Sequence, residues 1–270
     1  AIGLQMYKSS QSFRQQFSLD RIIPGQLNVK INGNPVQNQD VFIITDAKFL
    51  DWKNAEDAEI EYIRPGQSFV SRYNEIMQLK TPVLVYVDRQ FFDSFKRFRV
   101  HYNQERMVQD PMGNAAVFIL GGLQTVSTFE VSFNNVVEKA TLFNVVGVIP
   151  GKNKSDELVI FSGHYDHLGI VKPLAGDSIA NGADDDASGV TAVIALARYY
   201  KKLNNNERTL IFVAFTAEEA GLKGSQYFSK QLDPENVVAM FNIEMIGKES
   251  KFGKNAAFIT GFERSDLGPI

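Results

Sequence analysis

The sequence predicts an α/β protein with a largely parallel, mixed sheet covered by helices, preceded by a β-rich accessory region. From about residue 124, apolar runs of strand length alternate with helical stretches, which is typical of parallel sheets. Before that point, short β-type runs alternate with turn signals. The 270 residues, of which 44% are hydrophobic, suffice for one large or two modest domains. We therefore divide the chain into an accessory region, residues 1–123, and a second domain, residues 124–270.

Charge and composition exclude several classes of function. The chain has 28 basic and 31 acidic residues, a net charge of −3, so no positive field favours nucleic acid as a partner. No apolar stretch approaches the ~20 residues that cross a bilayer, and no leader is visible at the start. Because the chain has no cysteine, any metal must take histidine and carboxylate ligands.

The accessory region offers strands and turns but little chemistry. The runs "LNVKI", "VFIITD", "VLVYVD" and "AAVFIL" predict strands, with turns at Asn32–Gly33 and Pro65–Gly66. A helix is expected around "SFVSRYNEIMQL", and "DRQFFDSFKRFRVHYNQER" is interpreted as a long, less regular connection. We expect His101 in this stretch to be solvated or structural.

In the second domain, polar residues fall where predicted strands end. Strands are expected at "TFEVSF", "NVVGVIP", "ELVIFSG", "TLIFVAFT", "VVAMFNIE" and "AAFITG", and a buried helix at "SGVTAVIALARYYKKL". His164 and Asp166 follow one strand, Glu218 and Glu219 follow a second, and Glu244 ends a third. Ligands of open α/β sheets bind outside the carboxyl ends of the strands, so these side chains are expected to converge.

The motif "HYDH" places two of the three histidines around one aspartate. Alternate side chains of an extended segment share a side, so Asp166 can accept the second ring N–H of His164 and fix a metal-bound imidazole. The alternative is an ordinary surface pair. His167 could simply donate to a backbone carbonyl.

Three consecutive acids stand in "NGADDDASG", residues 181–189. Packing them beside an apolar helix is costly unless a cation or hydrogen-bond donors compensate. The alternative is a solvated acidic turn that caps the helix at Ser188. An EF-hand calcium loop is excluded, because its twelfth position would be Ala195 instead of a bidentate glutamate.

The remaining acids complete a set of possible metal ligands. Neighbouring Glu218 and Glu219 would point in opposite directions, so that one can bind a metal and the other can take a proton from water. The alternative is an acidic first turn of the helix that begins near Gly221. Glu244 lies in an apolar strand and needs a cation or a salt bridge. Together, His, Asp, Glu and Glu form a ligand set suited to zinc without sulfur.

These motifs, with "NVVGVIPG", "SGHYDHLG", "FTAEEAGLKGS" and "FNIEMIG", resemble the co-catalytic di-zinc aminopeptidase family over residues 124–270. Its superfamily includes glutamate carboxypeptidase, the inactive transferrin receptor and the glutaminyl cyclases. The resemblance implies the zinc-peptidase fold. It also implies that His164, oriented by Asp166, binds one zinc ion and that Asp185 bridges both ions. The bond between Asp185 and Asp186 resembles one that is often cis in this family.

The resemblance further implies that Glu219 binds the second zinc ion and Glu244 the first, while Glu218 is the general base. Two departures stand out. The family usually has Asp at the position of Glu244, and its second zinc ion takes a histidine from a later loop, whereas no histidine follows His167 here. We expect this chain to be the N-terminal portion of a longer protein with two zinc ions. The second site lacks its histidine in this chain, which alone could be inactive.

The leading interpretation is a zinc metallopeptidase, an aminopeptidase acting on peptide substrates. The alternatives are a glutaminyl cyclase-like enzyme with one zinc ion and a non-catalytic binding protein on a peptidase fold. By resemblance, the protein is expected to be secreted or periplasmic, and residues 1–123 are either protease-associated-like or a lineage-specific cap. The oligomeric state stays open.

Overall fold

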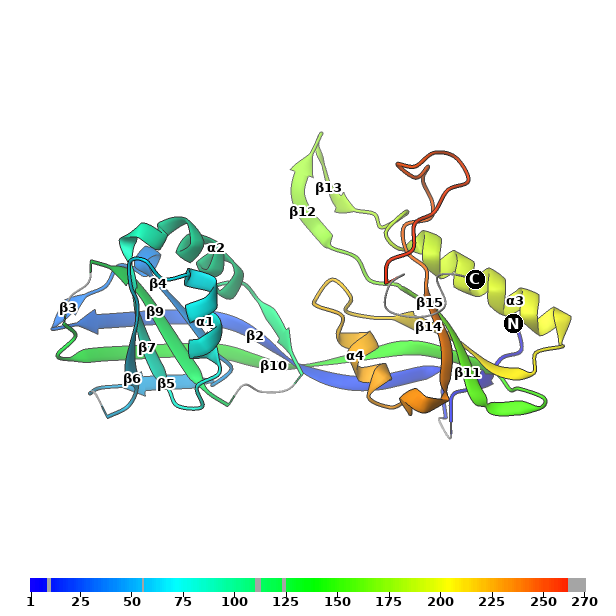
Figure 1. Cartoon of the computed structure of the whole chain (residues 1–270), viewed down its shortest axis with the longest axis horizontal. Coiled ribbons are helices and arrows are strands. Elements are labelled where there is room, and N and C mark those ends of the chain that lie inside the picture. Colours follow the sequence, from blue (N-terminus) through cyan, green and yellow to red (C-terminus); the bar gives the residue numbers. More distant parts are fainter. Residues whose placement is uncertain (9–10, 55, 110–112, 123–124, 262–270) are drawn as a thin grey trace. The chain divides into compact units, whose positions relative to one another are not determined.

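The computed structural model describes residues 1–8, 11–54, 56–109, 113–122 and 125–261. The chain forms two compact units, which we call the metal-site unit (residues 1–17 and 141–270) and the accessory unit (residues 18–140). Two long strands, β2 (Arg14–Ile31) and β10 (Phe129–Ile149), each begin in one unit and end in the other (Figure 1).

This boundary does not coincide with the predicted division after residue 123. The predicted strands "TFEVSF" and "NVVGVIP" are parts of the single strand β10, and its first part belongs to the accessory unit. Conversely, residues 1–17 belong to the metal-site unit, where β1 (Gln5–Met6) pairs with the end of β10. The role of residues 1–123 stays a prediction.

The accessory unit is built around a four-stranded sheet in the order β4-β9-β7-β6. Its strands, besides parts of β2 and β10, are β3 (Asn34–Pro35), β4 (Val41–Thr45), β5 (Phe49–Trp52), β6 (Glu59–Ile63), β7 (Val83–Asp88), β8 (Arg106–Val108) and β9 (Ala115–Gly121). Both faces of this sheet are buried, as the near-continuous apolar runs predict. In β4, Phe42 and Ile44 join one core cluster, and Val41 and Ile43 join the other.

Two helices cover one face of that sheet, so the unit is not only β-rich. The helix α1 (Phe69–Met77) begins after Ser68, whose side chain accepts from the N–H of Ser71. The stretch interpreted as an irregular connection forms a 3-10 turn, η2 (Arg89–Phe91), and the helix α2 (Phe92–Tyr102). That interpretation was wrong, because Phe95 and Phe98 are spaced to pack on the sheet. A second 3-10 turn, η1 (Asn38–Asp40), precedes β4.

In the metal-site unit, three neighbouring strands are parallel. Its elements, besides β1 and the end of β10, are β11 (Lys154–His164), β12 (Gly169–Leu174), β13 (Asp177–Ala180), α3 (Ala187–Leu203), β14 (Arg208–Phe215), α4 (Lys223–Ser229), η3 (Pro234–Asn236) and β15 (Val237–Asn242). β11 pairs in parallel with both β14 and β15, and β14 pairs antiparallel with β10. The predicted fold class, α/β with a mixed sheet, is confirmed.

Helices lie on both faces of this sheet. Along β14, Leu210 and Phe212 share a core cluster with Val193 and Ala197 of α3. Ile211, Val213 and Phe215 face the other side and share a cluster with Phe228 of α4. Because successive strand residues point to opposite faces, one continuous apolar run in β14 serves both cores.

The last described residues of the chain form turns and irregular backbone. "AAFITG", predicted as a strand, is not one: residues 256–261 form no strand, and residues 262–270 lie outside the described ranges. Among helices in the described ranges, none combines the length and hydropathy that a membrane crossing needs.

Candidate metal centre

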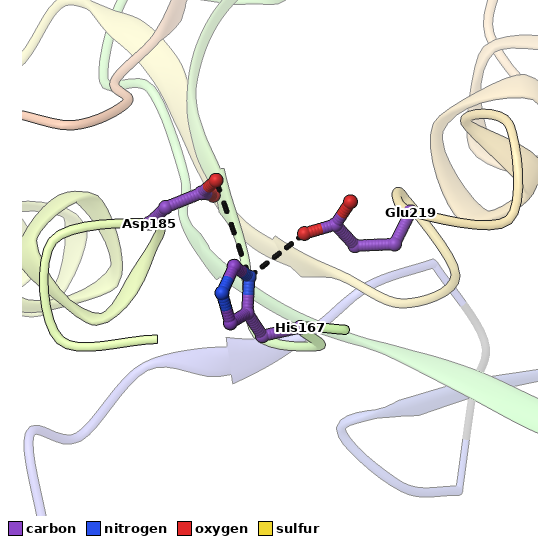
Figure 2. A group of neighbouring side chains, drawn as sticks. All are labelled: His167, Asp185 and Glu219. Atoms are coloured by element: carbon purple, nitrogen blue, oxygen red, sulfur yellow. Dashed lines mark ion pairs between the residues drawn. The ribbon is translucent and has the colours of Figure 1, made fainter. Parts of the chain in front are cut away.

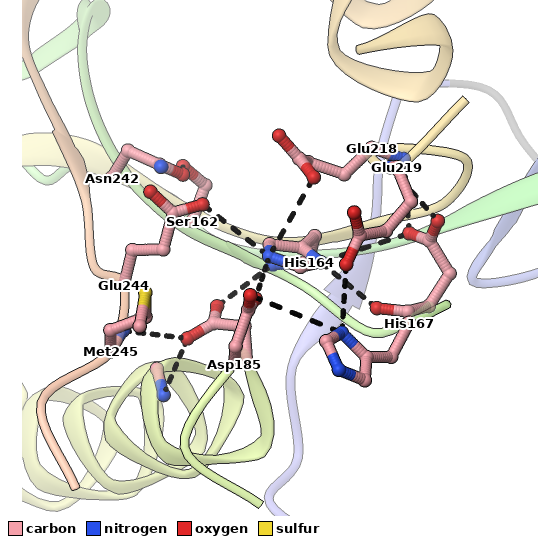
Figure 3. A network of polar contacts seen from close by, with 12 residues as sticks. Ser162, His164, His167, Asp185, Glu218, Glu219, Asn242, Glu244 and Met245 are labelled. Atoms are coloured by element: carbon pink, nitrogen blue, oxygen red, sulfur yellow. Dashed lines mark hydrogen bonds and ion pairs between the residues drawn. The ribbon is translucent and has the colours of Figure 1, made fainter. Parts of the chain in front are cut away.

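The predicted site residues converge at one edge of the sheet. His164 is the last residue of β11, Glu218 and Glu219 follow β14, and Glu244 follows β15. The three strands are parallel, so their carboxyl ends meet at the same edge. Asp185 reaches this edge from the loop before α3. Figure 3 shows these side chains gathered around His164.

The imidazole of His164 is oriented so that, in the neutral ring, Nδ1 carries the proton and Nε2 does not. Its side chain is only 3% exposed, and Nδ1 lies 3.0 Å from the backbone carbonyl oxygen of Asp166. Since a carbonyl only accepts, Nδ1 carries the proton. Nε2 then faces Oδ1 of Asp185 at 3.0 Å and Oε1 of Glu244 at 3.3 Å. Buried Nε2 has no hydrogen-bond partner among the described residues.

The neighbouring carboxylates influence the charge of His164. Burial alone would lower the pKa of the imidazole. The hydrogen bond to the Asp166 carbonyl and the negative charges of Glu218, Asp186 and Asp166 outweigh it, so the pKa is raised. The centre therefore attracts a positive charge at Nε2, either a proton or a metal ion.

The carboxylate of Asp166 has a different role from the one expected. It accepts the backbone N–H of Glu218 at Oδ1 (3.0 Å) and of Glu219 at Oδ2 (3.3 Å), and Oδ1 is 3.9 Å from Nδ1 of His164. The backbone carbonyl of Asp166, and not its carboxylate, accepts the hydrogen bond from the imidazole N–H of His164. Ala217 just before the glutamates has φ 53°, a left-handed conformation that turns the chain out of β14. Asp166 thus fixes the turn that carries both glutamates.

The three consecutive acids have three different surroundings. Asp184 accepts the N–H of Gly247 at 2.8 Å and lies 3.5 Å from Nζ of Lys248. Asp186 is 2% exposed and accepts the backbone N–H groups of His164, Gly189 and Met245. Backbone N–H donors thus compensate the negative charges of Asp184 and Asp186.

Asp186 also begins the helix α3, in place of the expected Ser188 cap, because its side chain accepts from the N–H of Gly189. Burial raises the pKa of Asp186, although its three N–H donors act in the opposite direction. The peptide bond between Asp185 and Asp186 is cis, as the resemblance implied. Asp185, the middle acid, faces both histidines (Figure 3).

Two glycines, Gly163 and Gly189, allow the backbone to approach the carboxylate of Asp186 closely. A Cβ atom on Gly189 would lie 2.0 Å from the backbone oxygen of Ile243 and 2.5 Å from Oδ1 of Asp186. A Cβ atom on Gly163 would lie 2.8 Å from Oδ2 of Asp186. The metal-site loops therefore pack at distances that a larger residue would prevent.

The structure adds one residue that was assigned no metal-binding role, His167. Its Nδ1 lies 2.7 Å from Oε1 of Glu219 and 4.0 Å from Oδ2 of Asp185 (Figure 2). One possible ligand atom from each of these three residues lies within 4.8 Å of the others. For His167 the sequence offered only one possible role, donation to a backbone carbonyl. The spacing in "HYDH" was the one signal that pointed to its place, since the loop after β11 has no regular period.

Glu218 has the surroundings of a proton acceptor. Its Oε2 lies 4.0 Å from Nε2 of His164, and its side chain is 28% exposed. Burial raises the pKa of Glu218, and Glu244, Glu219 and Asp166 add to this, while His164 acts in the opposite direction. A carboxylate with a raised pKa is a stronger base and holds an abstracted proton better.

The donor set fits zinc. In a tetrahedral zinc site with bonds of 2.0–2.2 Å, ligand atoms are about 3.4 Å apart. The separations of 3.0 and 3.3 Å around Nε2 of His164 are close to this value. A deprotonated ring nitrogen facing two carboxylate oxygens is repulsive unless a cation lies among them. Nitrogen and oxygen donors without sulfur are also an accepted zinc set.

Comparison with known proteins agrees with the motif resemblance. Residues 144–263 match the sequence model of Peptidase family M28. A "Probable zinc metalloprotease" of Pyrenophora teres f. teres is 32% identical over 143 residues, which is 51% of this chain and 27% of the relative. A "Vacuolar membrane protease" of Schizosaccharomyces pombe is 26% identical over 202 residues, 75% of this chain and 22% of the relative. The matches thus span about a quarter of these curated relatives.

Among solved structures, an aminopeptidase from Aneurinibacillus sp. strain AM-1 has a TM-score of 0.49 at 19% identity. The match covers 91% of this chain and 62% of that one. A zinc aminopeptidase from Bacillus subtilis has a TM-score of 0.36 at 20% identity, covering 87% of this chain and 60% of that one. The resemblance to the co-catalytic zinc peptidases is confirmed, and the part of the chain that matches Peptidase family M28, residues 144–263, is the part that carries the candidate metal centre.

Proposed function

We propose that this chain supplies the zinc ligands and the general base of a metallopeptidase that removes residues from the amino terminus of peptides. The observation that carries the proposal is the arrangement around His164. Its Nε2, which carries no proton in the neutral ring, lies 3.0 Å from Asp185, 3.3 Å from Glu244 and 4.0 Å from Glu218. Such a set both holds a cation and leaves one carboxylate to move a proton.

The residue roles follow from the contacts. His164, Asp185 and Glu244 would hold one zinc ion, and Asp185 and Glu219 would contribute to a second. The extra methylene of Glu244, compared with aspartate, does not keep its carboxylate away, since Oε1 is 3.3 Å from Nε2 of His164. Bound zinc lowers the pKa of water and polarises a carbonyl group.

Glu218 would act as the general base. Its side chain does not bind the N–H groups of its own turn, because Asp166 accepts those donors. The carboxylate is therefore free to take a proton from water as the oxygen attacks the peptide carbonyl. It then returns that proton to the departing amine, so that the carbonyl–nitrogen bond breaks. The products are the released amino acid, which keeps the water oxygen in its carboxyl group, and the shortened peptide with a new amino terminus.

Preference for a free amino terminus is supported by the charge of the centre. The carboxylates of Asp185, Glu219 and Glu244 face the same space, and the described residues place no lysine or arginine ion pair on these three. An α-ammonium group is attracted there, whereas the internal amide of a long peptide gains nothing. The relative named a probable zinc metalloprotease supports zinc and peptide hydrolysis for this chain.

The experiment replaces Glu218 with glutamine in the full protein. Glu218→Gln should retain bound zinc and lose turnover of an aminoacyl p-nitroanilide by about 10²–10⁴-fold, the range for removal of a general base. Glu56→Gln, an exposed glutamate of the accessory unit, is the matched control and should keep full activity. Unchanged hydrolysis by Glu218→Gln would contradict the assignment.

The two alternatives give different outcomes in the same assays. A glutaminyl cyclase would release ammonia from a peptide that begins with glutamine and would hold one zinc ion. A binding protein on the same fold would hold none and show no turnover. Secretion or export to the periplasm also stays a prediction, which fractionation of the source cells would test.

A further inference from the structure

We propose that His167 supplies the imidazole ligand of a second zinc ion, together with Glu219 and the outer oxygen of Asp185. The inference rests on the proposed function only in that it takes the first ion to lie at His164. It differs from the expectation that the second ion lacks a histidine in this chain. It also differs from the related enzymes, whose second histidine comes from a later loop.

The three groups already converge. Nδ1 of His167 is 2.7 Å from Oε1 of Glu219 and 4.0 Å from Oδ2 of Asp185, and one ligand atom of each residue lies within 4.8 Å of the others (Figure 2). The loop before Asp185 lies close to the side chain of His167, since a Cβ atom on Gly182 would lie 3.1 Å from the Cβ of His167. His167 is therefore positioned by packing as well as by charge.

The two separations lie on either side of the value that a zinc ion would impose. Ligand atoms of tetrahedral zinc are about 3.4 Å apart, so 2.7 Å is too short and 4.0 Å too long by well under 1 Å each. A shift of the exposed Glu219 side chain and a small rotation of the Asp185 carboxylate would suffice. No movement of the backbone is required.

An independent observation comes from the other histidine. The His164 side chain is 3% exposed, and its Nε2 has no hydrogen-bond partner among the described residues while facing Oδ1 of Asp185. Nδ1 of His167 is likewise buried without a hydrogen bond there, although Glu219 is close. Each oxygen of Asp185 thus faces one ring nitrogen, the arrangement of a carboxylate that bridges two cations.

A simple ion pair between a protonated His167 and Glu219 is the competing explanation. The contact at 2.7 Å lacks the geometry of a hydrogen bond, which that pair would be expected to form. The two explanations also differ in what happens when zinc is added. A metal ligand loses its proton at every pH at which the ion is bound, whereas an ion-paired imidazole continues to titrate.

Cobalt(II) is the first probe, because its visible absorption reports each ion that binds. The metal-free chain should take up two equivalents of Co²⁺. His167→Ala should keep one equivalent and bind the other more than tenfold more weakly. His101→Ala, at an exposed histidine of the accessory unit, should keep both. One equivalent in the unaltered chain, or two unchanged equivalents in His167→Ala, would overturn the proposal.

A spectroscopic test needs no substitution and is independent of how His167→Ala folds. The chain has three histidines, so ¹⁵N-labelled histidine gives three ring systems. With excess Zn²⁺, we expect the ¹⁵N resonances to show His164 bound through Nε2 and His167 bound through Nδ1, and those of His101 to be unchanged by zinc. If the ¹⁵N resonances of the His167 ring are the same with and without zinc, the inference is wrong.

Failure of this inference and failure of the proposed function can be told apart. Two bound ions without hydrolysis of any aminoacyl substrate would leave the His167 site in place and refute the peptidase. Hydrolysis by a protein with one bound ion, and with no metal on His167, would support the peptidase and refute the His167 site.

Discussion

The carboxylate of Asp166 accepts the backbone N–H groups of the two consecutive glutamates, at 3.0 Å from Glu218 and 3.3 Å from Glu219. It therefore connects the loop after β11 to the loop after β14. The imidazole of His164 is oriented by the backbone of the same residue, through its carbonyl oxygen at 3.0 Å. One aspartate thus positions the proposed metal ligand His164 and the proposed general base Glu218 through different atoms.

This relationship predicts the effect of Asp166→Asn. The amide nitrogen cannot accept an N–H, so one of the two glutamate donors loses its partner and the turn shifts. We expect activity of the full protein to fall about 10- to 100-fold, as for other residues that support metal-site groups. The proton of His164 should stay on Nδ1 in ¹⁵N spectra of the chain. If that proton moved to Nε2, the carboxylate and not the carbonyl would be orienting the ring.

Zinc should stabilise the metal-site unit. An ion that binds the folded chain only adds about 2.7 kcal/mol at a free concentration 100 times its dissociation constant. Thermal unfolding of the metal-free chain should therefore move to higher temperature on addition of Zn²⁺, and His164→Ala should reduce the shift strongly. Magnesium, which prefers six oxygen ligands, is the control and should have little effect. Equal shifts with both metals would contradict a site that prefers zinc.

Gly189→Ala should destabilise the same unit without removing any ligand. The new methyl group would meet the Ile243 carbonyl oxygen at 2.0 Å, and backbone atoms cannot move aside as a flexible side chain can. We expect a loss of roughly 1–3 kcal/mol in the free energy of unfolding, measured with urea. Gly122→Ala, where no atom lies within 4 Å of the new methyl group, is the control and should be close to neutral.

The accessory unit should be sensitive to alkali. Burial raises the pKa of Tyr73, and the hydrogen bond between its hydroxyl and that of Tyr102, at 2.6 Å, adds to the effect. Above about pH 10 an unfolded tyrosine loses its proton. The folded chain retains it, so the native state binds more protons and stability falls as pH rises.

Tyr73→Phe should remove much of this alkaline dependence, measured as the free energy of unfolding between pH 9 and 11. Tyr199→Phe is the matched control, because Tyr199 is 59% exposed on α3. If the two substitutions changed the pH dependence equally, the buried hydroxyl would not be its source.

The sequence indicated the edge of the sheet where the site lies, because each motif follows an apolar run of strand length. The ends of β11, β14 and β15 therefore carry His164, the glutamate pair and Glu244 as expected. The resemblance to the co-catalytic di-zinc aminopeptidases supplied what apolar patterning cannot, the distinction among Asp184, Asp185 and Asp186. In the structure that distinction depends on backbone N–H groups from other loops.

The sequence patterns did not predict three other features: the position of His167, the length of β10 and the helix α2. His167 lies in an irregular loop, and its approach to Glu219 depends on how two loops fold. The middle of β10, "NNVVEKATLF", is polar enough to resemble a connection, yet the strand runs without a break from Phe129 to Ile149. The helix α2 was missed although Phe95 and Phe98 were spaced for one, because charged residues between them suggested a solvated loop.

In the sequence, the accessory unit, residues 18–140, is inserted between the two segments of the metal-site unit, residues 1–17 and 141–270, and β2 and β10 connect them. Ile2, Leu4 and Tyr7, from the very start of the sequence, pack in the cores of the unit that holds the metal centre. A shortened protein that began at residue 124 would lose these core side chains and the edge pairing of β1. The minimal piece able to carry the centre must therefore include both ends of the described chain, joined across the accessory unit or by a short artificial linker in its place.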